Sequence, residues 1–98
     1  MTRRVRNHEL ASAELEAAIR WYEKQRHGLG GEFYDAVVRT IAQIIEQPEI
    51  GTAVDESTRR ILVRRFPYQV VYHLTPTDIT IVAVAHSKRR PNYWKGRR

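Results

Sequence analysis

The chain has 98 residues, of which 42% are hydrophobic and 29% are charged, and this composition suits one small domain with a single core. It has no cysteine, which excludes disulfides, thiolate metal sites and cysteine nucleophiles. No apolar run approaches the ~18 residues that a membrane span needs, and no apolar segment typical of a secretion signal follows the basic N-terminus. We therefore expect residues 1–98 to form a single cytoplasmic domain that does not enter a membrane.

Positive charge is distributed unevenly along the chain. Residues 1–50 contain seven Lys or Arg and eight Asp or Glu, a net charge of −1. Residues 51–98 contain ten and three, a net charge of +7, and six of these cations fall within residues 88–98. Such asymmetry favours a polyanionic partner, either a nucleic acid or an acidic protein segment. A basic tail that only increases solubility is the alternative interpretation.

The N-terminal half has the pattern of a short strand followed by a helix. Residues 5–7 have the composition of a short edge strand. Apolar side chains then recur with the spacing of an amphipathic helix, at Ala11, Leu15, Ala18 and Tyr22. The glycine-rich run at residues 28–31 predicts the end of this helix, because glycine readily adopts the conformation of a helix C-cap.

A second amphipathic helix is predicted over residues 32–47. Pro48 ends it, since proline lacks an N–H and disfavours helical geometry at the preceding residue. Two helices joined by a short link predict an antiparallel hairpin. The apolar stripe of the second helix consists of Phe33, Val37, Ile41 and Ile44, widened by Val38 and Ile45.

Beyond Pro48 the hydrophobic period changes from that of a helix to that of a strand. Residues 49–58 read as a loop, and residues 59–64, 68–74 and 79–86 then alternate or are rich in β-branched side chains. Three strands with short links predict an antiparallel meander. Helices first and strands afterwards predict an α+β fold, in which the helix hairpin covers one face of an antiparallel sheet.

Short motifs occur along nearly the whole chain in a fixed order. The helices contribute ELEAA at 14–18, WYE at 21–23, GLG at 28–30 and EF at 32–33. The strands and the tail contribute RILV at 60–63, FPYQVVY at 66–72, AVAH at 83–86 and RRPNYW at 89–94. In this order, the motifs resemble those of the RelE/ParE superfamily of bacterial toxins.

The resemblance implies the toxin of a type II toxin–antitoxin system, which inhibits growth, needs no cofactor and is neutralised by a cognate antitoxin protein. Family members divide by target: RelE-like toxins cut mRNA on the ribosome, and ParE-like toxins inhibit DNA gyrase. The basic second half, with aromatic residues beside its cations, favours a ribosome-dependent mRNA endoribonuclease. The alternatives are a ParE-like inhibitor of gyrase that catalyses nothing and a toxin relative that has lost its activity.

RNA cleavage needs a base for the 2′-OH, stabilisation of the phosphorane charge and an acid for the leaving oxygen. The resemblance implies that Arg89 binds phosphate and that Tyr93 stacks on a base. With Arg64 and His86, these residues make up the catalytic hypothesis. The expected RNA-binding residues are Arg60, Lys88, Arg90 and Trp94.

Two positions depart from the RelE-like pattern. Leu62 stands where a lysine is expected, and Gln69 stands where an arginine is expected. Related toxins use other acid–base sets that include histidine, and His73 or His86 could serve in that way. The four histidines lack the spacing of metal ligands, so we expect no metal site.

Overall fold

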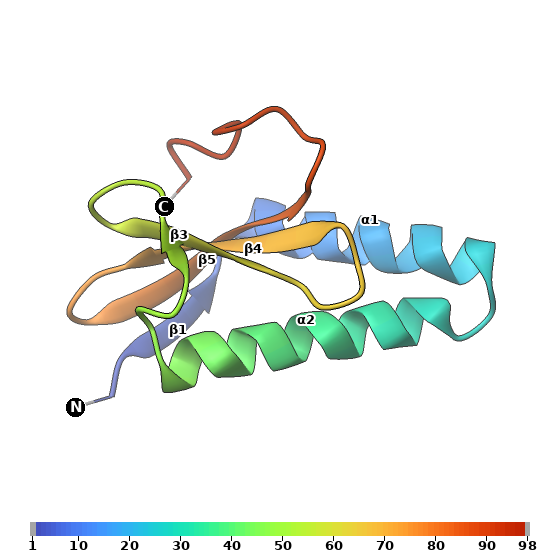
Figure 1. Ribbon diagram of the computed structural model, residues 1–98, viewed down its shortest axis with the longest axis horizontal. Helices are drawn as coiled ribbons and strands as arrows, with labels where there is room; N and C mark the ends of the chain where they lie inside the picture. The colour runs from blue at the N-terminus through green and yellow to red at the C-terminus, as the bar shows by residue number, and fades with distance from the viewer. Residues whose placement is uncertain (1, 98) are drawn as a thin grey trace.

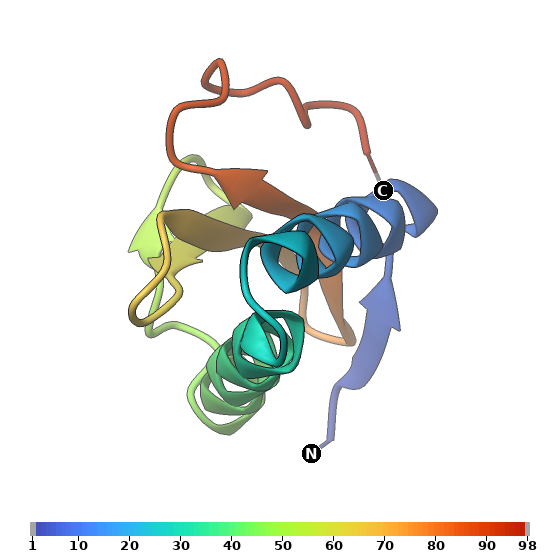
Figure 2. The same cartoon turned by 90° about the vertical axis from the view of Figure 1, so that its right-hand side faces the viewer.

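Two helices and five strands make up the residues that the computed structural model describes, 2–97 (Figure 1). In chain order they are β1 (Arg4–Asn7), α1 (Glu9–Gln25), α2 (Leu29–Glu46), β2 (Thr52–Ala53), β3 (Thr58–Leu62), β4 (Tyr68–Leu74) and β5 (Asp78–His86). The strands form one sheet in the order β1-β5-β4-β3-β2, and the helix hairpin covers one of its faces (Figure 2). The predicted α+β fold, with its short N-terminal edge strand, is confirmed.

The sheet is mixed rather than wholly antiparallel. β1 runs parallel to β5, with Val5 opposite Ile79, and the other neighbouring strands are antiparallel. A parallel neighbour requires a long crossover connection, which the helix hairpin and the strands β2–β4 provide. The predicted antiparallel meander therefore describes β3, β4 and β5, and β1 adds a parallel edge.

The sequence does not predict β2, which lies within the expected loop at residues 49–58. Thr52 pairs with Arg60 of β3, and the nearby Val54 N–H donates to the Thr58 carbonyl oxygen at 2.8 Å. A strand of two residues is too short to display the alternation by which strands are recognised. This short strand nevertheless matters, because it forms one wall of the site described below.

The link between the helices differs from the prediction in where the second helix begins. The link consists of residues 26–28, in which Gly28 has a left-handed φ of 91°, and α2 begins at Leu29, before the predicted start at residue 32. The Glu23 carboxylate on α1 accepts hydrogen bonds from the N–H groups of Gly28 and Gly30, so it caps α2 from the neighbouring helix. A Cβ on Gly30 would lie 2.7 Å from the Ile19 carbonyl oxygen, so only glycine permits this close approach.

The main core lies between the hairpin and the sheet. On α2 it includes the predicted residues Phe33, Val37 and Ile44, which are fully buried. Val38 and Ile45, which the prediction adds to this stripe, are instead 44% and 49% exposed. Each follows a buried residue and is therefore turned about 100° around the helix, away from the sheet. Within residues 2–97, neither helix is both long enough and apolar enough to cross a bilayer.

The opposite face of the sheet is covered by the C-terminal tail, residues 87–97, which follows β5 (Figure 1). Trp94 is only 7% exposed and packs with Val71, Val82, Ala83 and Ala85 in a second apolar cluster. Burial on both faces explains why β5 reads as a nearly continuous apolar run rather than a strict alternation.

Tyr72 fixes the loop that leads from α2 into β2. Its side chain is fully buried, its hydroxyl donates to the Pro48 carbonyl oxygen at 2.7 Å, and it accepts from the Gly51 N–H at 3.0 Å. The Arg59 guanidinium also donates to the Glu49 and Gly51 carbonyl oxygens. These bonds hold β2 against the edge of β3.

Replacing Tyr72 with phenylalanine should destabilise the protein by about 1–3 kcal/mol, because the Gly51 N–H and the Pro48 carbonyl would lose a buried partner. Urea unfolding of Tyr72→Phe and the parent measures this change in the free energy of unfolding. Tyr34→Phe is the control, since Tyr34 is 47% exposed. Equal stability of Tyr72→Phe and Tyr34→Phe would contradict the role of the Tyr72 hydroxyl in holding this loop.

Candidate functional site

Six of the eight predicted site residues line one hollow between the tail and the face of the sheet opposite the helices. We call it the cationic hollow; its volume is about 310 Å³, and Ala53, Val54 and Gln69 also contribute to its walls. Arg64 and Lys88 are exposed and do not line it. The six predicted residues that it brings together are Arg60, His86, Arg89, Arg90, Tyr93 and Trp94.

The tail is held in place by Glu14, a residue of α1. One carboxylate oxygen of Glu14 accepts from the Val84 N–H of β5 at 3.0 Å, and the other accepts from the Tyr93 hydroxyl at 2.8 Å. The same oxygen lies 3.1 Å from the Arg97 guanidinium, and both charged side chains are largely buried, with 14–16% of each exposed. Arg97 also donates to the Val82 carbonyl oxygen at 3.0 Å. One carboxylate therefore joins α1, β5 and the tail.

Sequence reasoning does not assign a role to Glu14 or Arg97. The signal for Glu14 is its position, because it follows Ala11 by three residues and precedes Ala18 by four, on the buried side of α1. An acidic residue on such a face needs a polar partner. Arg97 carries no comparable signal, since it lies among other cations near the chain end.

Tyr93 is engaged on its ring and on its hydroxyl. The Arg89 guanidinium carbon lies 3.9 Å from the centre of the ring, and that of Arg97 lies 5.1 Å from it. Burial, together with the hydrogen bond to Glu14, raises the pKa of Tyr93 from its ordinary value of 10.0 to about 12. At neutral pH the phenol is therefore protonated, and its proton is donated to Glu14.

Trp94 and Tyr93 pack the tail against the sheet. Trp94 is buried, and the ring of Tyr93 packs against the same cluster while carrying two guanidinium groups. The two aromatic residues that lie beside the cations in the sequence therefore stabilise the fold by packing the tail against the sheet. Neither presents an open ring face comparable to a stacking platform for bases.

His86 ends β5 beside the hollow. Its Nδ1 accepts from the Lys88 N–H at 3.0 Å, and its ring meets the Tyr68 ring edge-on, with centroids 5.1 Å apart. His73 lies farther along β4 and does not line the cationic hollow. Within residues 2–97, no group of three His, Asp or Glu side chains is placed to hold a metal ion.

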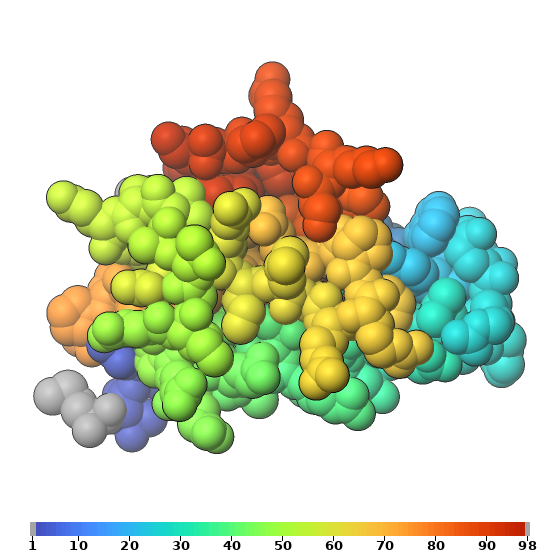
Figure 3. Space-filling model, viewed as in Figure 1, coloured from blue at the N-terminus to red at the C-terminus, as the bar shows by residue number. Residues whose placement is uncertain are grey.

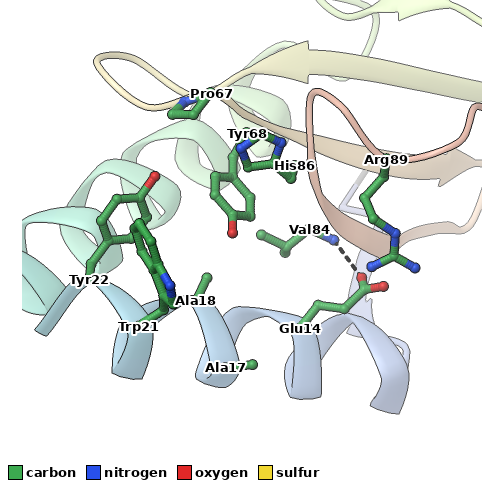
Figure 4. Close-up of a pocket in the computed structure, with 10 residues that line it drawn as sticks. All are labelled: Glu14, Ala17, Ala18, Trp21, Tyr22, Pro67, Tyr68, Val84, His86 and Arg89. Carbon is green, nitrogen blue, oxygen red and sulfur yellow. Dashed lines mark hydrogen bonds between the residues drawn. The ribbon is translucent and has the colours of Figure 1, made fainter. Parts of the chain in front are cut away.

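A second, apolar groove of about 560 Å³ lies between α1 and the sheet, where β4 begins and β5 ends (Figure 4). Trp21, Tyr22 and Pro67 line one end, and Glu14 and Arg89 line the other, as the close-up shows. Trp21 is 56% exposed although it is the largest apolar side chain on α1. Arg89 and His86 line both the groove and the cationic hollow, so the two surfaces are continuous.

Replacing Glu14 with alanine should release the tail. The Val84 N–H and the Tyr93 hydroxyl lose their acceptor and Arg97 loses its ion-pair partner, so we expect a loss of about 2–3 kcal/mol of stability. In a Trp21→Phe background, where Trp94 is the remaining tryptophan, its fluorescence should shift to the red as the indole meets water. Glu16→Ala, a change on the exposed side of the same helix, is the control. An unshifted Trp94 spectrum in Glu14→Ala would contradict the role of this carboxylate.

The raised pKa of Tyr93 should make stability fall in alkali. Because the folded-state pKa is higher than the unfolded value, the protonated phenol favours the folded state. This contribution is present below about pH 10 and is lost as the pH rises through about 12. Comparing chemical unfolding and phenolate absorbance of Tyr93→Phe and the parent over this range isolates Tyr93 from the other tyrosines. Parallel pH profiles of the two proteins would contradict the prediction.

Comparison with known proteins gives a consistent result. A sequence profile described as "ParE toxin of type II toxin-antitoxin system, parDE" matches residues 5–91. The chain is 34% identical over 96 residues to Toxin ParE2 of Mycobacterium tuberculosis strain CDC 1551 / Oshkosh, covering 94% of this chain and 89% of the relative. Toxin ParE2 of strain ATCC 25618 / H37Rv gives the same values.

The fold is also similar to that of a solved protein chain. The structure described as "Chromosomal ParDE TA system from P. aeruginosa" matches with a TM-score of 0.76, covering 87% of this chain and 96% of that one. The sequence identity is 13%, so this likeness concerns the fold alone. With the profile over residues 5–91 and the two curated relatives, the resemblance predicted from the motifs is confirmed. The chain belongs to the ParE toxin family of type II toxin–antitoxin systems, within the RelE/ParE superfamily.

Proposed function

We propose that this toxin stops growth by binding DNA gyrase in the bacterial cytoplasm rather than by cutting mRNA, and that its cognate antitoxin blocks this binding. The observation that carries the proposal is how the side chains in and beside the cationic hollow are used. Its tyrosine donates to Glu14, Arg89 lies over that tyrosine, and Gln69 and the nearby Leu62 occupy positions where RNA-cleaving relatives carry cations. These groups serve the fold or are uncharged.

Proton transfer to and from RNA needs two groups with suitable pKa values within reach of the reacting atoms. Among the described residues that line the hollow there is one histidine, His86, the residue type most often used for proton transfer in proteins. Because the pKa of Tyr93 is raised to about 12, its phenol is protonated at neutral pH and does not accept the proton of the 2′-OH. Cleavage would therefore require one histidine to act both as the base and as the acid, without a second proton-transfer group beside it.

The apolar groove supports a protein as the target or partner. Exposed tryptophan at the rim of an apolar groove is typical of residues that contribute strongly to protein–protein binding. Arg89 at the other end, where the groove meets the cationic hollow, gives it the amphipathic character that an acidic protein segment would match. These features suit a toxin that acts by occupying a protein surface.

The clustering of Arg60, Arg89 and Arg90 with His86 favours the second candidate, a ribosome-dependent mRNA endoribonuclease. The two functions make opposite predictions about His86. A histidine that transfers protons is indispensable to cleavage, whereas a toxin that only binds needs it for packing and for the hydrogen bond from Lys88.

The test replaces His86 with asparagine, whose side-chain oxygen can still accept from the Lys88 N–H but cannot act as an acid or base at neutral pH. We expect His86→Asn to stop growth as the parent does when expressed without antitoxin. We also expect both purified proteins to inhibit supercoiling of relaxed plasmid by gyrase, while primer extension shows intact mRNA on ribosomes. His27→Asn, on the exposed hairpin link, is the control. Cleavage of ribosome-bound mRNA that disappears in His86→Asn, with gyrase unaffected, would overturn the proposal in favour of the endoribonuclease.

A further inference from the structure

We propose that the cationic hollow binds a backbone phosphate of duplex DNA, so that the toxin contacts DNA in addition to a protein target. The inference rests on the proposed function only for its biological setting, because gyrase acts on duplex DNA. The binding itself is a property of this chain and is measured without gyrase.

The first argument is the convergence of charge. Arg60 comes from β3, and Arg89 and Arg90 come from the tail, yet all three line one hollow, and no acidic residue is among the described residues that line it. In the space-filling view the tail lies along the surface formed by the β2–β3 segment (Figure 3). Within residues 2–97, none of these three arginines forms an ion pair, whereas Arg4, Arg26, Arg65 and Arg97 each do.

The second argument is that the fold itself holds the walls of the hollow. Burial of Trp94 and the bonds from Glu14 hold the tail over the sheet, so Arg89 and Arg90 line the same hollow as Arg60. Asn92 supports this path with a left-handed φ of 66°, a conformation that asparagine tolerates better than most residues. Because the tail is held in place by the fold, binding avoids much of the entropic cost of ordering that segment.

The third argument concerns the kind of anion. A guanidinium can donate two parallel hydrogen bonds. The two non-bridging oxygens of a phosphodiester share its negative charge and can accept from arginines on different sides. Single-stranded nucleic acid is usually held by stacking of its bases on open aromatic rings. Here Tyr93 is covered by Arg89 and Trp94 is buried, so the hollow suits a backbone phosphate whose bases remain paired.

The experiment measures binding of a short, fluorescently labelled DNA duplex of mixed sequence by anisotropy, at several salt concentrations. The parent should bind with an affinity that falls as salt rises, because phosphate contacts release counterions. Arg60→Gln and Arg90→Gln should each weaken binding about tenfold and reduce the slope of log K against log salt by about one. The controls are Arg20→Gln and Arg39→Gln, which remove the same charge from exposed positions on α1 and α2 and should change the slope little.

Three outcomes would overturn the inference. Equal losses in the control variants would mean that overall charge, not the hollow, attracts DNA. Tighter binding of single-stranded than of duplex DNA would contradict the argument from the covered aromatic rings. Binding of a glutamate-rich peptide, lost in Arg60→Gln, without measurable affinity for duplex would assign the hollow to an acidic protein segment. DNA binding as expected with gyrase unaffected would contradict the proposed target alone and would support the phosphate site.

Discussion

The Glu14 carboxylate is the interaction on which the functional surfaces depend. It satisfies the Val84 N–H at a point of β5 beyond the residues that pair with β1, and it holds Tyr93 and Arg97 of the tail. An unpaired strand edge and a terminal segment are each weakly held by themselves. Because one side chain serves both, the position of the tail is coupled to the packing of α1 on the sheet. The walls of the apolar groove and of the cationic hollow follow from this single anchor.

The two surfaces share Arg89 and His86, and this continuity has a consequence for binding. An anion in the cationic hollow lowers the local positive potential that an acidic segment in the apolar groove would meet. The effect is reciprocal, since coupling between two binding sites is the same free energy seen from either side.

The parts of the fold that the sequence predicts are those with local causes. The bounds of β4 agree with the predicted residues 68–74, because Pro67 and the Thr75-Pro76 turn limit an alternating segment. The pairing of β1 with β5 depends on residues more than seventy positions apart, and no local pattern encodes it. The early start of α2 likewise depends on a carboxylate of the preceding helix. Where the sequence fails, a partner on a different helix or strand decides the structure.

The candidate site shows the same division. Charge counting predicts that cations gather in the second half, and the structure brings three of them into one hollow. It does not predict what the neighbouring aromatic residues do, because a Tyr-Trp pair beside arginines fits base stacking and tail packing equally well. Burial of Trp94 and the Glu14–Tyr93 bond favour packing. A basic surface whose aromatic rings are used by the fold retains its attraction for anions but has fewer means of reading bases or moving protons. These properties support the proposal that the toxin acts by binding rather than by catalysis.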